Sequence, residues 1–222
     1  MNEPGEHELL LSSSSVVDSP DPGSLSKHFE CTIAPPNADE YMRELEFKAT
    51  QCYVLATPNI DHLLTLSKLN IQHAINQNIV AIGMTLEWLK SDESISIFSV
   101  MCPGFSERGI PVSLRPTMLQ RTKPHHPWLD IFPFPQMRDN IIAVEDVIDD
   151  IQLCRDVIAF WDTRNTGAML LVWGHPWDPK NWEVTPEFLQ KWGWAIRGCS
   201  EILESTNAWR SLRGEQKLTW IC

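Results

Sequence analysis

A stretch dense in proline, residues 102–135, is the strongest constraint on how this chain folds. Proline has a fixed φ, lacks a backbone N–H and restricts the residue before it, so neither a long helix nor a central strand continues through it. The same stretch is rich in aromatic and aliphatic residues from Trp128 to Phe134, which is not typical of a disordered linker. We therefore expect it to be ordered, packed and built from one-turn pieces. The prolines concerned are Pro103, Pro111, Pro116, Pro124, Pro127, Pro133 and Pro135.

Before this stretch, the sequence predicts helices over residues 39–52 and 62–90. The second has apolar residues at spacings of three and four, which form one stripe on a helix and indicate a core-facing side. Gly83 weakens this helix by about 1 kcal/mol relative to alanine. The stripe consists of Ile71, Ile75, Ile79, Ile82, Leu86 and Leu89.

After the proline-dense stretch, further helices are predicted. Residues 137–161 have a stripe of Val147, Ile151, Cys154 and Ile158. A helix start is indicated at Thr185, because threonine caps a helix, Pro186 suits its first position and Glu187 favours the positive end of its dipole. Its expected buried face comprises Phe188, Trp192, Ala195, Cys199 and Ile202. A last short helix over 206–215 is expected to end near Gly214.

Two short strands are expected, over 94–100 and 168–173. The predicted fold class is therefore mainly α: a single helical domain with long proline- and tryptophan-rich connectors and little or no sheet. We place this domain at residues 39–222. Residues 1–38 hold five prolines, seven serines and six acids against one lysine. This composition predicts a disordered acidic tail.

The net charge of −11 disfavours direct nucleic-acid binding, because affinity for DNA comes largely from lysine and arginine. No apolar run approaches the ~20 residues that cross a bilayer, and the N-terminus lacks the pattern of a secretory signal. We therefore expect a nuclear or cytoplasmic protein without a membrane partner. The six cysteines lie 21 or more residues apart, so we expect reduced, mostly buried thiols.

The segment "VWGHPWDPKNWEV" (172–184) holds three of the ten tryptophans, eight of which lie between Trp161 and Trp220. We expect Gly174 to take a positive φ, Trp173 to face the core, and Trp177 and Trp182 to hold the loop down. Clustered tryptophans either line a ligand pocket or pin loops to a core. Arginines beside them pair with acids and stack on indoles, which fits ion pairs between connectors or a pocket for an anionic small molecule.

Histidines 125, 126 and 175 with Asp130 and Asp178 have the chemistry of a metal site, but they lack the spacing of a helical ligand pair, so we predict no metal. No nucleophile elbow or phosphate-binding glycine motif is present, and we predict neither catalytic residues nor a cofactor. The candidate pocket residues are His125, His126, Trp128, Asp130, Arg138, Trp173, His175, Trp177, Asp178, Trp182 and Arg210.

Four phrases occur in order between about Asp61 and Glu215: "LSKLNIQHAINQNIVAIGM", "LRPTMLQRTKPHHPWLDIFPFPQMRDNII", "LLVWGHPWDPKNWEVTPEFLQKWGW" and "STNAWRSLRGE". Together they resemble the fungal domain of unknown function 3425, which commonly follows a basic leucine zipper in transcription factors of filamentous fungi. The resemblance implies a role in transcription regulation, in some members connected with stress or secondary metabolism. It carries over no catalytic residue.

No basic region like that of a zipper precedes Asp61, since residues 1–38 have one lysine and no arginine. We therefore expect a stand-alone regulatory domain that binds a protein partner or a small effector. The alternative is an enzyme acting on a fungal secondary metabolite in a pocket lined by histidine, aspartate, arginine and tryptophan. A third hypothesis is a zipper protein whose upstream exon was lost or missed.

Overall fold

The computed structural model describes residues 37–54, 60–91, 93–100, 106–158 and 169–219. Within these ranges the chain is mainly helical, which confirms the predicted fold class. The predicted tail lies almost entirely outside the described residues, and the domain boundary stays a prediction. The α-helices are α1 (Ala38–Val54), α2 (Ile60–Ala81), α3 (Leu86–Lys90), α4 (Met118–Thr122), α5 (Pro135–Val144), α6 (Asp150–Ile158), α7 (Pro186–Trp192) and α8 (Ser200–Leu212).

The proline-dense stretch is ordered and built from short pieces, as predicted. Its described part, from residue 106, contains α4 and a series of 3₁₀ helices of three to five residues. Thr117 and Gln120 form a capping box at the start of α4. The 3₁₀ helices of the described chain are η1 (Glu107–Gly109), η2 (Val112–Leu114), η3 (Pro127–Ile131), η4 (Glu145–Val147), η5 (Pro179–Asn181) and η6 (Gly193–Ile196).

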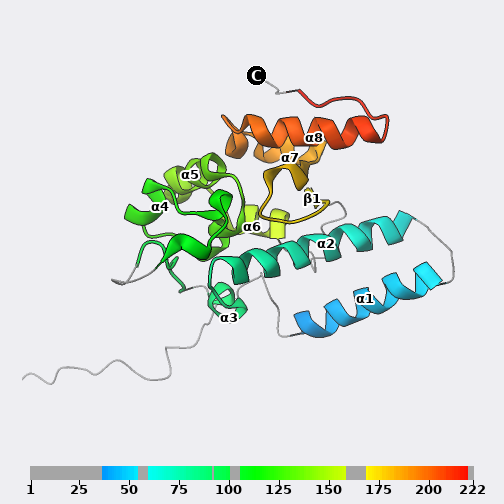
Figure 1. Ribbon diagram of the computed structural model, residues 1–222, viewed down its shortest axis with the longest axis horizontal. Helices are drawn as coiled ribbons and strands as arrows, with labels where there is room; N and C mark the ends of the chain where they lie inside the picture. The colour runs from blue at the N-terminus through cyan, green and yellow to red at the C-terminus, as the bar shows by residue number, and fades with distance from the viewer. Residues whose placement is uncertain (1–36, 55–59, 92, 101–105, 159–168, 220–222) are drawn as a thin grey trace, which may run out of the picture.

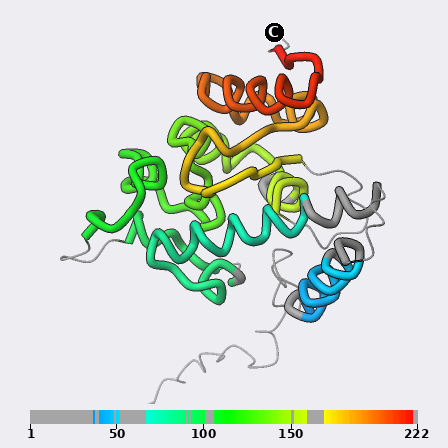
Figure 2. The backbone as a smooth tube through the Cα atoms, turned by 45° about the vertical axis from the view of Figure 1, so that its right-hand side comes forward, coloured from blue at the N-terminus to red at the C-terminus, as the bar shows by residue number. Residues whose placement is uncertain are grey.

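A two-stranded antiparallel hairpin lies at the centre of the fold. Strand β1 (Leu170–Val172) confirms the strand predicted over 168–173, and β2 (Trp182–Val184) is its unpredicted partner. Helix α2 contacts β1 and α8 contacts β2, so the hairpin lies between these two helices (Figures 1 and 2). The loop that joins the strands, 173–181, is thereby fixed at both of its ends.

Helix α2 ends where its sequence contains glycine. Gly83 has φ +80°, and the amides of Gly83 and Met84 bond the carbonyls of Val80 and Ile79. These two bonds form a Schellman motif, in which glycine takes the left-handed conformation at low steric cost. The predicted helix over 62–90 is therefore divided into α2 and α3. Its apolar stripe still faces the core, with only Leu86 partly exposed.

Two sequence-based predictions are wrong. Residues 94–100 form turns, because the Ser96 hydroxyl accepts from the amide of Phe98 and the Ser96 carbonyl accepts from that of Ser99. The helix predicted over 137–161 ends at Val144, where η4 begins, and Asp149 accepts from the amide of Gln152 at the start of α6. Val147, expected on the buried stripe, is 81 % exposed.

The C-terminal helices follow their predicted signals. Thr185 caps α7 by accepting from the amide of Phe188, and Pro186 is the first helical residue. The predicted buried face is entirely buried, although η6 and a turn at Gly198 (φ +82°) separate α7 from α8. The last helix therefore begins earlier than predicted, at Ser200, and a further left-handed glycine, Gly214, follows it.

Candidate functional site

Five polar side chains from the proline-dense region and its neighbours lie together in the core. Each is at most 4 % exposed, although a core position normally requires an apolar residue. They come from the turn after α3, from α4, from the residue two before η3, from η3 itself, and from α5. We call them the buried polar network: Ser96, Gln120, His125, Asp130 and Arg138.

Asp130 is the acceptor at the centre of this network. Its Oδ1 lies 3.0 Å from Nε2 of His125 and accepts from Nε2 of Gln120 at 2.6 Å. Its Oδ2 accepts from the Ser96 hydroxyl at 2.6 Å. A buried carboxylate requires several donors to replace its lost hydration. Asp130 has three within the protein, so it joins three separate segments of the chain.

Arg138 is the main hydrogen-bond donor of this network. Its guanidinium donates to the carbonyls of Ser113, Arg115 and Phe132, and its Nε donates to Oε1 of Gln120. Burial lowers the pKa of Arg138 to about 10, while the negative charges of Asp130 and Asp139 act in the opposite direction. The side chain therefore remains charged at neutral pH, and it closes the loop around η2 onto α5.

His125 has both ring nitrogens paired inside the protein. Nδ1 lies 2.8 Å from the Lys123 carbonyl, and Nε2 faces Asp130. Burial lowers the pKa of His125, but the hydrogen bond and the negative charge of Asp130 outweigh it, and the net shift is upward. A general acid or base must reach the proton that it transfers. The ring of His125 is instead occupied by two groups of its own chain.

The neighbouring candidates in this region also hold local structure. His126 caps η3, since its Nδ1 accepts from the Trp128 amide, while its Nε2 lies 3.0 Å from the Ser91 carbonyl. Trp128 is buried and meets the Phe132 ring edge-on, with centroids 5.9 Å apart. Both residues thus fasten η3 to the α3 turn and to the core.

The loop 173–181 places its candidate residues in a different environment. Trp182 is 1 % exposed and its indole N–H donates to the Pro176 carbonyl at 2.7 Å, as expected for a side chain that holds the loop down. Trp177 is half-buried, and the exposed His175 ring stacks on it at 5.0 Å between centroids. Asp178 caps η5 by accepting from the Lys180 amide.

Two expectations for this loop are wrong. Gly174 is not among the glycines with positive φ; its Cβ position lies 2.8 Å from Cγ of Asn181, so the missing side chain serves close packing. Trp173 does not face the core and is 42 % exposed. It lies beyond the end of β1, where it stacks on Trp209 with centroids 5.3 Å apart and donates to Glu183.

The remaining candidate, Arg210, lies at the C-terminal end of α8. Its Nε donates to the Gln216 carbonyl at 2.6 Å, and its Nη1 pairs with Oε2 of Glu215 at 3.0 Å. Nearby, Arg213 pairs with both Glu215 and the buried Glu183, and these carboxylates raise its pKa. Arg210 therefore orders the chain that follows α8, and no hydrogen bond or ion pair among the described residues joins it to the buried polar network.

The segments 124–139 and 172–184, which hold most of the candidate pocket residues, contact each other through backbone groups and aromatic rings. Asn78 of α2 donates to the carbonyls of Ile131 and Pro176, at 2.8 and 3.1 Å. Ser113 donates to the Trp177 carbonyl while its own carbonyl accepts from Arg138. Trp182 also meets the rings of Phe132 and Phe134 edge-on. The contacts between the two segments are therefore structural. They do not bring the candidate histidines together, because the ring of His125 is buried and that of His175 is exposed.

Several of these connecting residues have no strong signal in the sequence. Gln120 is detectable only through the Thr–x–x–Gln spacing of a capping box. Ser96, Asn78, Ser113 and Glu183 act through contacts with distant segments. Asn78 has a further peculiarity, because its Oδ1 is the one buried side-chain oxygen or nitrogen without a hydrogen-bond partner among the described residues.

Within the described ranges, no three histidine, cysteine, aspartate or glutamate side chains gather in a way that suits a metal ion. In the same part of the chain, no helix combines the length and apolar character needed to cross a membrane. These two findings concern the described residues alone.

Comparison with known proteins finds a family model over part of the chain and no individual relative. No curated protein and no solved structure matches the chain. A family model, described as Domain of unknown function (DUF3425), matches residues 100–203. This range contains the buried polar network except Ser96, both strands, and the two longest phrases on which the resemblance rests. Residues 100–203 thus match the model of the domain of unknown function that the sequence resembles.

Proposed function

We propose that the chain is a regulatory domain that acts by binding a protein partner and not by direct contact with DNA. The observation that carries this proposal is the state of His125, Asp130 and Arg138. These are the residues best suited to chemistry, and they are buried and paired with groups of the same chain. They support a scaffold that presents its surface to a partner.

Charge supports the same proposal. At −11 the chain repels a phosphate backbone, whereas it attracts a basic protein surface and speeds the encounter with it. The family resemblance supports a role in transcription, since zipper proteins with this domain are regarded as transcription regulators. We infer a nuclear or cytoplasmic role in regulation, for which stress response and secondary metabolism are the processes that the resemblance suggests.

Affinity capture from a fungal nuclear extract tests the proposal. The full chain is immobilised, the extract is digested with nuclease, and retained proteins are identified by mass spectrometry. An unrelated acidic globular protein of equal net charge serves as the control for nonspecific attraction. We expect a transcription regulator to be retained by the chain and not by the control. Retention of none, or retention that disappears with nuclease, contradicts the proposal.

A further inference from the structure

One serine of the chain follows a basic residue at a distinctive spacing. Of the 18 lysines and arginines, only Arg197 has a serine or threonine three residues after it, and that residue is Ser200. Protein kinases select substrates partly by the pattern of charge around the acceptor, because carboxylates in the kinase bind the basic side chain. A single spacing arises often by chance, so the exposure and the partners of the two side chains decide whether a kinase can use it.

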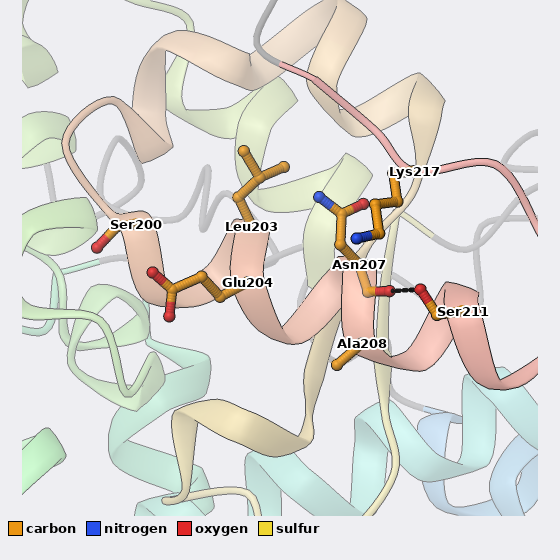
Figure 3. A pocket seen from close by; sticks show the side chains of 7 residues that line it. All are labelled: Ser200, Leu203, Glu204, Asn207, Ala208, Ser211 and Lys217. Atoms are coloured by element: carbon orange, nitrogen blue, oxygen red, sulfur yellow. Dashed lines mark hydrogen bonds between the residues drawn. The ribbon is translucent and has the colours of Figure 1, made fainter.

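Both side chains are exposed and lack partners in the described part of the chain. No hydrogen bond or ion pair among the described residues involves the guanidinium of Arg197 or the hydroxyl of Ser200. Figure 3 shows Ser200 at one end of a hollow along α8, with its hydroxyl directed away from the other labelled side chains. Other arginines are engaged in ion pairs or hydrogen bonds, among them Arg121, Arg138, Arg210 and Arg213.

The backbone from Arg197 to Cys199 lies outside any helix. Arg197 has φ −60° and ψ 128°, Gly198 has φ +82°, and Cys199 has φ −93° and ψ 79°. The first turn of α8 follows without a side-chain cap, because Cys199 makes no capping hydrogen bond. Cys199 is the one buried side chain of the segment 197–200. Access of a kinase to Ser200 therefore requires the release of this side chain and of one weakly held turn.

Ser211 provides an internal comparison on the same helix. It is exposed and lines the same hollow as Ser200. Its hydroxyl, however, donates to the Asn207 carbonyl at 2.6 Å, and the residue three positions before it is Ala208. Ser200 thus differs from an equally exposed serine in its free hydroxyl and in the arginine that precedes it.

We propose that Ser200 is phosphorylated by a serine kinase that selects arginine three residues before its acceptor. Oγ of Ser200 forms a bond to the γ-phosphorus of ATP, the bond from that phosphorus to the β–γ bridging oxygen breaks, and ADP leaves. The hydroxyl proton passes to the catalytic aspartate of the kinase. The product gains about 1.5–2 negative charges at pH 7. The free Arg197 favours this added charge, and Glu204, one turn further along α8, opposes it.

Phosphorylation of the folded chain tests the proposal. The full chain and a synthetic peptide of residues 195–204 are incubated in parallel with magnesium ATP and a purified kinase of this arginine-directed class. Site-resolved mass spectrometry then measures the rate at each serine and threonine. We expect phosphate on Ser200 of the full chain, at a rate within tenfold of that of the peptide. Phosphorylation of the peptide alone shows that the fold hides the serine, and phosphorylation of neither shows that the spacing is not recognised; both results overturn the proposal.

Matched variants test the part of Arg197. Arg197→Gln should slow phosphorylation of Ser200 at least tenfold, whereas Arg108→Gln, at an exposed arginine followed three residues later by Pro111, should change it less than twofold. Equal rates in the two variants, or phosphate chiefly on Ser211, contradict the proposal. The inference does not rest on the proposed function, because the kinase reaction needs no regulatory partner. Failure of the affinity capture would therefore leave it unchanged.

Discussion

Nε2 of His125 lies 3.0 Å from Oδ1 of Asp130, and neither side chain has exposed surface. Burial opposes the charged imidazolium, but Asp130 and the Lys123 carbonyl raise the pKa of His125 overall. A histidine whose pKa is higher in the folded than in the unfolded state stabilises the fold fully below the unfolded pKa, about 6.5. This contribution is lost as the pH rises through the folded pKa.

We therefore predict that the free energy of unfolding, measured with urea, decreases as the pH is raised from 6 upward. His125→Gln should reduce this dependence. Because other groups titrate in the same range, the difference between the two proteins is the quantity to compare. A difference that grows in favour of the unmodified chain with rising pH contradicts the assignment.

Gly174 provides a second prediction, from packing. A Cβ there would lie 2.8 Å from Cγ and Nδ2 of Asn181, whose amide donates to the His175 carbonyl. Gly174→Ala should reduce the free energy of unfolding by about 1–3 kcal/mol, the usual range for overpacking. Adding Asn181→Ala should recover part of that loss, because the two changes share one contact.

The control for this prediction is Gly193. Nothing lies within 4 Å of its Cβ position, and its φ of −54° is helical. Gly193→Ala should be neutral or stabilise by up to about 1 kcal/mol, since alanine restricts the unfolded chain. If both alanine variants behave alike, close packing at Gly174 is not the reason for its glycine.

Cys199 provides a third prediction, from reactivity. Burial, supported by the charge of Glu201, raises the pKa of Cys199 to about 12, while a hydrogen bond from the Met137 backbone acts in the opposite direction. Because the thiolate is the reactive form, iodoacetamide at pH 8 should leave Cys199 unmodified in the folded chain. Peptide mass spectrometry should detect its modification after denaturation in urea, and rapid labelling without urea contradicts its burial.

The sequence predicts elements whose signals are local. Thr185 and Pro186 mark the start of α7 because a cap depends on a few adjacent residues. The proline-dense stretch likewise forms short helices because each proline acts on its own neighbours. Val147 departs from its predicted stripe because α5 ends before it, at Val144, although no residue in 145–149 is a strong helix breaker.

The buried polar network is largely beyond sequence reasoning. His125, Asp130 and Arg138 are recognisable as unusual residues, but their partners Ser96 and Gln120 are supplied by other segments. The burial of Trp173 and Trp182 could not be predicted either. Both lie in the same tryptophan-rich segment, yet Trp173 is exposed and Trp182 is buried. Pairing of Val172 with Trp182 leaves Trp173 beyond the strand, and only the fold determines that register.

The central claim is that His125, Asp130 and Arg138 build the fold and do not form an active site. The free energy of unfolding of Arg138→Met tests it most directly. Removing the guanidinium deprives three backbone carbonyls and Oε1 of Gln120 of their donor in the core. We predict a loss of about 3–5 kcal/mol, because several buried acceptors lose their donor at about 1–3 kcal/mol each. An unchanged or increased stability, common when active-site residues are replaced, would contradict the claim.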